Sequence, residues 1–373
     1  MKIVFICGSL EPGKDGVGDY TRRLAAAIIK NGYKATLIAL RDKYVAEFVS
    51  NFQDTEGTSV PILRLPAKFP TEIILKRCKE YISVFNPDWI SLQYVPFSFQ
   101  DKGLPFGLSK LVNQITKGYR LHIMFHELWV GMNKEATLKM FCWGYVQKKM
   151  VISFFKQVNP LLVHTQTKFY QQQLNKISIV AKLLPLFSNI KVVAQETRIK
   201  YKSNIHLIVF GSIHPGAPIN DFAKEAAEYC LENNLEIALN FIGRCGNEQE
   251  RWASVWRLHG MQATILGEQP EKEISYELSN ASIGVANTPY ELMDKSGAVA
   301  AMKEHGLPII CLSHNWTYNE ICNEEINKKS FQYTKGNLPL LINKKTLPHK
   351  TNLAVIATFF VNELLLCKKD YFS

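Results

Sequence analysis

Short apolar runs alternate along the chain with longer segments in which apolar residues recur every three or four positions. The strand-like runs stand at residues 2–8, 34–40, 88–95, 120–128, 161–166 and 181–187, and then at 205–211, 237–243, 263–267, 281–288 and 308–312. Apolar runs of this length, bounded by glycine or polar residues, are typical of buried parallel strands. Their alternation with helical segments predicts an α/β protein whose parallel sheets carry helices on both faces.

One polar interruption divides this pattern in two. The charged stretch 188–204 precedes a fresh strand, after which the alternation of strands and helices starts again. We therefore expect two α/β domains that are joined near residue 200. The expected boundaries are 1–198 for the N-terminal domain, 199–350 for the C-terminal domain and 351–373 for a last helix.

The composition allows large cores and favours anionic partners. Of the 373 residues, 47% are hydrophobic, and the formal net charge is +11. Such a charge suits nucleotides, nucleic acid or an anionic membrane surface, and a plain solvated basic surface is the alternative. Because the basic residues are spread out and no nucleic-acid-binding module is recognisable, we expect no nucleic-acid partner.

The eight cysteines indicate a reducing compartment. No pair has the C-x2-C spacing of a zinc or redox site, and several cysteines stand inside apolar runs, as buried thiols do. The chain starts with a strand-like run instead of a signal peptide, and no apolar stretch reaches bilayer length. We therefore expect a cytoplasmic protein that touches a membrane, if at all, peripherally on its inner face.

The first glycine-rich stretch is similar to two known phosphate loops and matches neither. After Gly8-x4-Gly13-Lys14, a nucleotide-triphosphate loop requires Ser or Thr, but this chain has Asp15. The dinucleotide fingerprint fails as well, because Thr21 stands where its last glycine belongs.

Gly16, Val17 and Gly18 are instead expected to form a glycine-rich loop, with a helix that starts near Asp19. Glycine lets the backbone approach a ligand closely, and the amides at a helix N-terminus favour an anion. An ordinary strand-to-helix turn is the alternative.

Lys295, Ser296 and Gly297 stand at a second junction of a strand, a loop and a helix. The lysine adds positive charge where helix amides already point. One anion-favouring loop in each domain predicts a ligand that is held between the two domains.

Four stretches in order along the chain resemble retaining glycosyltransferases of the GT-B fold, in the family-four-like set known as group 1. They are EPGKDGVGDYTRRLAAAIIKNGYKATLIAL, LQYVPFSF, MFHELW and TPYELMDKSGAVAAMKEHGLPII. The resemblance covers nearly the whole chain and implies two Rossmann-like domains that face a central cleft. It also implies that the N-terminal domain binds the acceptor, that the C-terminal domain binds a nucleoside-diphosphate-sugar donor, and that the last helix crosses back to the N-terminal domain.

Two residues are the predicted catalytic ones. The resemblance implies that His126 contacts the donor sugar, although a histidine in this position could also be an ordinary core residue. Glu291 matches the first residue of the family's paired-glutamate motif and would accept hydrogen bonds from sugar hydroxyls. The second glutamate of that motif is replaced by Val299, which puts the usual ribose contact in doubt.

The remaining predicted residues bind the donor. Ser212 replaces an arginine that many relatives use for the diphosphate, so Lys295 or, second, Arg244 is expected to supply the cation; Arg244 could equally be a surface residue. Glu268 stands where relatives place the donor base. The complete predicted donor-binding set is Gly16, Val17, Gly18, Gly211, Ser212, Arg244, Glu268, Lys295, Ser296 and Gly297. No D-x-D motif is present in the sequence, and enzymes of this fold generally work without metal, so no cofactor is expected besides the nucleotide-sugar substrate.

The segment 137–158 mixes lysines with aromatic residues, among them Phe141, Tyr145, Lys148 and Lys149. This mixture suits a helix at an anionic membrane interface, where a lipid-linked acceptor would be found. The alternative is an amphipathic helix that packs its aromatic residues into the core.

The leading hypothesis is therefore transfer of a sugar from a nucleoside-diphosphate sugar to a saccharide or lipid-linked acceptor, with retention and without metal, in bacterial-type cell-surface polysaccharide or glycoconjugate synthesis. A nucleotide-sugar epimerase and a non-catalytic GT-B binding protein are the alternatives. The epimerase would need a carboxylate near C2 of the sugar, for which the sequence has no distinctive motif.

Overall fold

The computed structural model describes all residues except 194–203, 315, 318–330, 344–351 and 370–373. The chain divides into two compact units. Unit 1 comprises Met1–Met132, Ala136–Pro185 and Asn352–Ser373, and unit 2 comprises Asn133–Glu135 and Leu186–Thr351. The junction that we expected near residue 200 lies outside the described residues.

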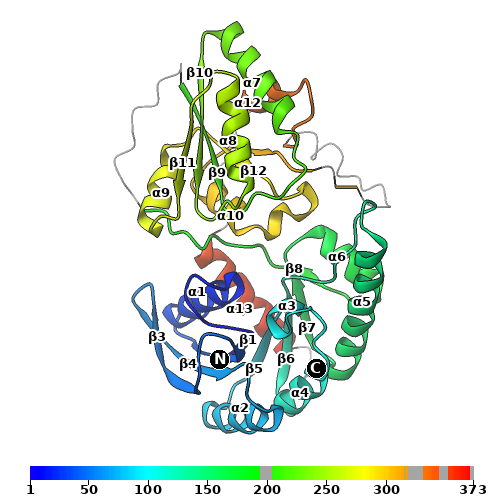
Figure 1. Cartoon of the computed structure of the whole chain (residues 1–373). Coiled ribbons are helices and arrows are strands. Elements are labelled where there is room, and N and C mark those ends of the chain that lie inside the picture. Colours follow the sequence, from blue (N-terminus) through cyan, green and yellow to red (C-terminus); the bar gives the residue numbers. More distant parts are fainter. Residues whose placement is uncertain (194–203, 315, 318–330, 344–351, 370–373) are drawn as a thin grey trace. The chain divides into compact units, whose positions relative to one another are not determined.

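Unit 1 is built on an eight-stranded sheet in the order β3-β4-β2-β1-β5-β6-β7-β8 (Figure 1). Its strands are β1 (Lys2–Cys7), β2 (Lys34–Asp42), β3 (Val49–Thr55), β4 (Thr58–Pro66), β5 (Trp89–Tyr94), β6 (Arg120–Phe125), β7 (Leu162–Thr165) and β8 (Lys182–Leu183). All neighbouring strands are parallel except the β3–β4 hairpin at one edge. The central strands are almost entirely buried, as a parallel sheet covered on both faces requires.

The helices of unit 1 are α1 (Gly16–Lys30), α2 (Thr71–Phe85), α3 (Pro96–Phe99), α4 (Leu108–Thr116), α5 (Leu138–Val158), α6 (Lys168–Asn175) and α13 (Leu353–Lys369). The helix α13 follows unit 2 in the chain but belongs to unit 1, where it packs beside α1 (Figure 1). The ring of Phe360 on α13 lies 5.9 Å from that of Phe5 on β1. The last helix therefore covers one face of the sheet of unit 1.

Unit 2 is built on a five-stranded parallel sheet in the order β11-β10-β9-β12-β13. Its strands are β9 (Asn204–Phe210), β10 (Glu236–Ile242), β11 (Ala263–Gly267), β12 (Ile283–Ala286) and β13 (Ile309–Cys311). Its helices are α7 (Ile219–Asn233), α8 (Glu248–Leu258), α9 (Glu271–Asn280), the 3-10 helix η1 (Tyr290–Lys295), α10 (Gly297–Glu304) and α12 (Leu338–Ile342). One face of the sheet packs against fully buried aromatic side chains, among them Phe222, Trp252 and Trp256.

The predicted fold class is confirmed, because both units are parallel sheets covered by helices. Three details of the prediction are wrong. The β3–β4 hairpin was not expected, the run at 181–187 forms only the two-residue strand β8, and α1 starts at Gly16 instead of near Asp19. The last difference arises because Asp15 caps the helix, so residues 16–18 are its first turn and not a loop.

Candidate functional site

The candidate site residues lie at the carboxyl ends of the strands in each unit, where open parallel sheets bind ligands. In unit 1, the loop that joins β1 to α1 is held by two buried charged side chains. Asp42 accepts hydrogen bonds from Ser9 Oγ at 3.1 Å and from the Leu10 amide at 3.0 Å. Arg64 donates to Asp42 through Nε at 2.7 Å and to Glu11 at 2.6 Å. These contacts fix the loop from Ser9 to Glu11 against the sheet.

Within this cluster, the buried charge of Asp42 is paired with that of Arg64. Asp42 has no exposed surface, and Arg64 is 8% exposed. Burial by itself would raise the pKa of Asp42, but the hydrogen bonds from Arg64 and Leu10 outweigh it and hold the pKa below its ordinary value. Asp42 is therefore a structural anion whose charge is already compensated.

The first turn of α1 is occupied by the protein's own carboxylates. Asp15 accepts a hydrogen bond from the Gly18 amide at 2.7 Å, and Asp19 accepts one from the Gly13 amide at 3.1 Å. Burial raises the pKa of Asp15 despite its favourable contacts with the amides of Gly18 and Val17. Two acidic side chains at a helix N-terminus oppose a second anion there, which weakens the expectation that residues 16–18 cradle the donor diphosphate.

The two glycines of this turn differ in their surroundings. An added Cβ at Gly18 would lie 2.5 Å from the backbone oxygen of Ser9, whereas one at Gly16 would meet nothing within 4 Å. Gly18 is therefore required for the close approach of α1 to the preceding loop, and this is a packing role.

His126 lies directly after β6 and is 5% exposed. Its Nε2 contacts Gln93 Oε1 at 2.9 Å, and its Nδ1 contacts Gln166 Nε2 at 3.1 Å. The ring of Tyr20 on α1 meets the imidazole edge to face, with the ring centres 4.9 Å apart. The structure therefore brings α1 and His126 together, and it engages both imidazole nitrogens with glutamine side chains.

In unit 2, the loop after β9 meets the start of α10. An added Cβ at Gly211 would lie 3.6 Å from Cβ of Ala298, in the first turn of that helix. Ser296 caps the helix by accepting a hydrogen bond from the Val299 amide, and the Thr288 hydroxyl donates to Ser296 Oγ at 3.3 Å. The structure thus brings the predicted residues 211 and 296–297 to one place.

Three neighbouring loops of unit 2 are tied together by Asn287, at the end of β12. Its Oδ1 accepts the His214 amide from the loop after β9, and its Nδ2 donates to the Leu312 oxygen after β13 at 2.9 Å. Glu291 is half-buried on η1, and Lys295 ends the same helix directly before the cap of α10. Both predicted residues therefore stand beside this set of loops.

Arg244 and Glu268, on the next two loops, form an ion pair. Arg244 Nε lies 2.8 Å from Glu268 Oε2, and the two side chains are 57% and 66% exposed. Ser212 is exposed as well. An exposed pair of this kind contributes little stability and is free to rearrange around a ligand.

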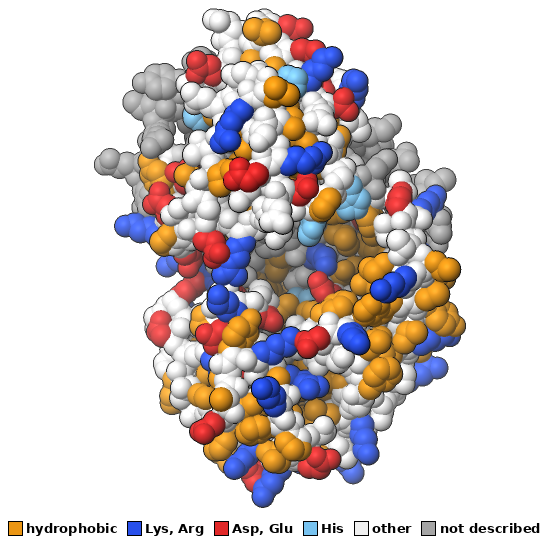
Figure 2. Space-filling view, viewed as in Figure 1, with side chains coloured by type: hydrophobic (Ala, Val, Ile, Leu, Met, Phe, Trp, Pro, Cys, Tyr) orange, Lys and Arg blue, Asp and Glu red, His pale blue; other side chains and the backbone are white. Residues whose placement is uncertain are grey.

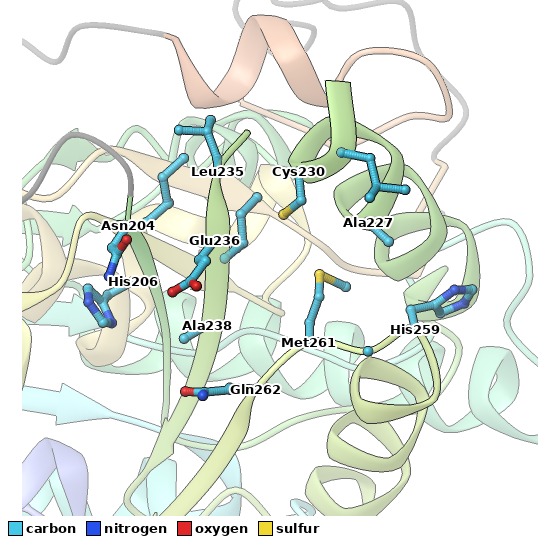
Figure 3. Close-up of a pocket in the computed structure, with 14 residues that line it drawn as sticks. Asn204, His206, Ala227, Cys230, Leu235, Glu236, Ala238, His259, Met261 and Gln262 are labelled. Carbon is cyan, nitrogen blue, oxygen red and sulfur yellow. The ribbon is translucent and has the colours of Figure 1, made fainter. Parts of the chain in front are cut away.

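A hollow of about 350 Å³ opens at the amino ends of the strands of unit 2, opposite the predicted site residues (Figure 3). The side chains of Asn204, His206 and Glu236 line it from the amino ends of β9 and β10, with Cys230 from α7 and Met261 before β11. None of the predicted site residues lines this hollow. Because parallel sheets bind ligands at their carboxyl ends, we do not assign it to the donor.

A second hollow, of about 490 Å³, lies in unit 1 at the carboxyl end of β2. The starts of α2 and α4 flank it, and its lining combines aromatic rings with amide and charged side chains. These include Phe69, Phe106, Gln100, Arg41 and Lys110. Aromatic faces beside a few polar hydrogen-bonding groups are a lining typical of small-molecule sites.

The helix α5 exposes an apolar stripe opposite its buried face. Its N-terminal half exposes Leu138, Phe141 and Tyr145 by 78%, 58% and 54%, whereas Phe154 near its C-terminus is buried. Figure 2 shows hydrophobic side chains gathered on the side of unit 1 where Figure 1 places α5, with lysine and arginine side chains among them. The aromatic residues of this segment are therefore split between the core and the surface. None of the described helices is long and apolar enough to cross a bilayer.

The sequence reasoning missed the polar side chains that support these loops. Gln93, Gln166 and Asn287 each follow or interrupt an apolar strand run, which is the one signal that could have marked them. Asp42 and Arg64 could not be paired from sequence, because they lie on different strands and only the register of β2 and β4 brings them together.

No protein-family model and no curated protein sequence matches the chain. Several solved structures do match the chain. A structure of Anabaena Alr3699/HepE in complex with UDP and glucose matches with a TM-score of 0.55 at 11% identity, over 100% of both chains. The UDP-GlcNAc 2-epimerase of Methanocaldococcus jannaschii matches at 0.54 and 10% identity, over 98% of this chain and 100% of that one.

The lipopolysaccharide outer core galactosyltransferase WaaB also matches, with a TM-score of 0.51 at 12% identity, over 97% of this chain and 91% of that one. At such identities the comparison establishes architecture alone. Two Rossmann-like parallel-sheet units in this order are what these structures and the chain share. The chain therefore has the GT-B fold, which nucleotide-sugar epimerases and glycosyltransferases have in common.

Proposed function

We propose that the protein is a glycosyltransferase that moves a sugar from a nucleoside-diphosphate sugar to a saccharide or lipid-linked saccharide. The observation that carries this proposal is the junction in unit 2 where Gly211 lies beside the capped start of α10, with Lys295 one residue before the cap. Amides at a helix N-terminus together with a cation suit a leaving diphosphate. A similar structure that contains UDP and glucose supports this choice of ligand.

The other roles follow from the resemblance of the sequence to retaining, family-four-like enzymes. Glu291 would accept hydrogen bonds from hydroxyls of the donor sugar, and His126 would contact the same sugar. Ser296 and Gly297 would face the diphosphate, and Glu268 would lie near the base. The reaction would proceed with retention, in the synthesis of a cell-surface polysaccharide or glycoconjugate.

A nucleotide-sugar 2-epimerase is the second candidate, because a UDP-GlcNAc 2-epimerase is among the similar structures. The two activities leave different products. An epimerase converts UDP-GlcNAc into its C2 epimer without an acceptor, whereas a transferase releases UDP and forms a new glycosidic bond. Proton NMR of reactions with and without saccharide acceptors distinguishes them.

A thermal-shift panel tests whether a nucleotide sugar binds at all. The panel contains UDP-glucose, UDP-galactose, UDP-GlcNAc, GDP-mannose and ADP-glucose. A ligand that binds only the folded protein stabilises it by about 2.7 kcal/mol at 100 times its Kd. We expect one of the five to raise the melting temperature. If none does, the proposal fails, and a non-catalytic GT-B binding protein becomes the favoured alternative.

The donor site is tested with a pair of lysine variants. Lys295→Met should weaken binding of the active nucleotide sugar roughly tenfold or more, since a hydrogen bond to a charged group contributes about 1.5–3 kcal/mol. Lys224→Met removes the same charge from α7, where Lys224 pairs with Glu228. It should leave the affinity unchanged. Equal effects of both variants would point to general electrostatics instead of a diphosphate contact.

For the acceptor we propose a lipid-linked saccharide, approached at a membrane surface through α5. Its exposed residues Leu138, Phe141 and Tyr145 are accompanied by Lys148 and Lys149, whose ammonium groups lie over aromatic rings. Apolar side chains flanked by lysines suit the interface of an anionic bilayer.

Sedimentation with vesicles tests this part of the proposal. Binding should require anionic lipid, should weaken with salt and should be lost in Phe141→Ser/Tyr145→Ser. Leu231→Ser, at an apolar site on α7 in unit 2 that is even more exposed than Phe141 and Tyr145, is the control and should not alter binding. Binding to vesicles that ignores both salt and the double variant would exclude α5 as the contact.

A further inference from the structure

A continuous line of buried polar side chains crosses the face of the sheet of unit 1 that α13 covers. Side chains two residues apart on a strand share a face, and paired residues on neighbouring parallel strands do too. The register pairs Ser91 with His122 and Gln93 with Met124, and Met124 in turn with His164. All of them therefore share one face, and it is the face covered by α13, because the rings of His122 and His164 lie 5.0 and 6.3 Å from that of Phe360 on this helix. Ser91, Gln93, His122 and His164 are each at most 1% exposed.

These side chains form a chain of contacts that ends at α13. It starts at Gln166 Nε2, which lies 3.1 Å from His126 Nδ1. The following contacts are His126 Nε2 to Gln93 Oε1 at 2.9 Å, Gln93 Nε2 to Ser91 Oγ at 2.7 Å, Ser91 Oγ to His122 Nδ1 at 2.8 Å, and His122 Nε2 to His164 Nδ1 at 3.0 Å. His164 Nε2 then lies 3.9 Å from Glu363 Oε2, and Lys182 Nζ lies 2.5 Å from the same oxygen.

The carboxylate at the end of this chain sets the direction of every bond in it. An ionised carboxylate only accepts hydrogen bonds, and that of Glu363 forms an ion pair with the Lys182 ammonium. Within the described residues, His164 Nε2 is buried and makes no hydrogen bond, so an N–H there is stabilised by pointing at the carboxylate. His164 is then protonated on Nε2, and its Nδ1 must accept.

The requirement that each contact pairs one donor with one acceptor then fixes every following hydrogen bond in this series. Because His164 Nδ1 accepts, His122 must donate from Nε2 and accept on Nδ1 from the Ser91 hydroxyl. Ser91 Oγ therefore accepts from the amide nitrogen of Gln93, whose amide oxygen faces His126. His126 must then carry its proton on Nε2, and its Nδ1 accepts from Gln166.

We propose that Glu363 is a positioning residue for His126: its carboxylate orients a one-way hydrogen-bond chain that holds the His126 imidazole in the Nε2–H tautomer, with both nitrogens turned into the protein. His126 then serves the site through its shape and its ring edge, and it does not exchange a proton with a substrate. This consequence for catalysis rests on the proposed function, but the orientation of the chain does not.

The chemistry of the two middle histidines supports an orienting role. Burial lowers the pKa of His122 well below its ordinary value and that of His164 to about 4, so both stay neutral, as the relay of donors and acceptors requires. Apolar residues of similar volume would fill this space without the cost of burying polar groups. A continuous chain of buried hydrogen bonds, in contrast, specifies one arrangement of the groups it joins.

Long-range proton–nitrogen NMR of the protein with 15N-labelled histidine measures the inference directly, since the two ring nitrogens report which of them carries the proton. His126 is assigned from the signal that disappears in His126→Gln. In the unaltered protein we expect a single Nε2–H tautomer at His126.

Glu363→Gln and Ser91→Ala break the chain at two places. The glutamine amide can donate or accept, and alanine removes the link, so both variants should give a mixture of tautomers at His126. Glu363→Asp keeps a carboxylate and should preserve the single tautomer. Lys182→Met is the matched control, because it removes the same ion pair but leaves the acceptor, and it should also preserve the tautomer.

The outcomes separate orientation from simple packing. A structural role alone would lower the melting temperature in Glu363→Gln without changing the His126 tautomer. An unchanged tautomer in both Glu363→Gln and Ser91→Ala, or an Nδ1–H tautomer in the unaltered protein, overturns the inference. Two variants are used so that a failure of one to fold leaves the other to decide.

A turnover assay with UDP-glucose or UDP-GlcNAc then separates this inference from the proposed function. If His126 contacts the donor sugar, Glu363→Gln should lower kcat in proportion to the displaced tautomer, about twofold for an even mixture, with little change in KM. A changed tautomer with unchanged turnover would remove His126 from the reaction, and the orientation by Glu363 would still be established.

Discussion

Arg64→Met should destabilise unit 1 more than any exposed charge change, because it leaves a buried carboxylate without its cation. Asp42 has no exposed surface, and Arg64 donates to it at 2.7 Å. Removing one partner of a buried ion pair typically costs about 3–5 kcal/mol, a large share of the 5–15 kcal/mol that stabilises an ordinary domain. The loop held by Asp42 through Ser9 and Leu10 should loosen at the same time.

Hydrogen exchange followed by mass spectrometry is the suitable assay, because tryptophans lie in both units and fluorescence would mix their transitions. Peptides from β1 and β2 should lose protection in Arg64→Met. The double variant Asp42→Asn/Arg64→Met should lose less than the sum of the two single changes, by about 1–3 kcal/mol. Lys43→Met removes a neighbouring charge whose side chain is half exposed and should change nothing measurable.

The same ion pair predicts how the stability of the protein changes at acidic pH. The pKa of Asp42 is below its ordinary value of 3.8 in the folded protein, so the unfolded chain binds a proton at a higher pH than the folded one. The stabilisation is complete at a pH above the ordinary pKa of 3.8, and it is lost as the pH falls through the lower pKa of the folded protein. A loss below about 1 kcal/mol in Arg64→Met, or equal losses in Arg64→Met and Lys43→Met, would refute the reasoning.

Three further predictions rest on single contacts. Gly18→Ala should destabilise the protein by about 1–3 kcal/mol because its Cβ meets the Ser9 oxygen at 2.5 Å, whereas Gly16→Ala, in open space, should be neutral or slightly stabilising in thermal unfolding. Ser296→Ala should cost about 1 kcal/mol by removing the cap of α10, as measured by urea unfolding, and Ser296→Asp should restore it. Burial lowers the pKa of His164 from 6.5 to about 4, so the free energy of unfolding should fall by up to about 3 kcal/mol as the pH drops from 6.5 towards 4. His164→Gln should flatten that part of the plot of stability against pH.

Hydrophobic periodicity determined the fold class because it reports burial directly. Parallel strands buried on both faces must be continuously apolar, so runs such as 2–8 and 205–211 are visible in the sequence alone. The hairpin strand β3 escaped notice for the same reason, since most of its residues are exposed and no apolar run marks it. Helix starts were less certain, because a cap such as Asp15 depends on one side-chain contact.

The candidate site was only partly visible in the sequence. The motif order located Lys295, Ser296 and Gly297 at a strand-to-helix junction, and the structure has that junction, with Ser296 as the cap. The expectation that residues 16–18 form a loop was wrong, because the amide of Gly18 is taken up by Asp15. Neither glutamine at His126 could be anticipated, since Gln93 lies on β5 and Gln166 follows β7.

The sequence by itself therefore determined which segments are buried strands and helices, and it located the strand ends where ligands of α/β proteins bind. Only the tertiary structure decided which polar side chains meet. The pairs Asp42–Arg64 and His164–Glu363 join residues 22 and about 200 positions apart, and their contact depends on strand register and on the return of α13 to unit 1. Local patterns record whether a residue is buried, but the partner of a buried charge is set by the packing of distant elements.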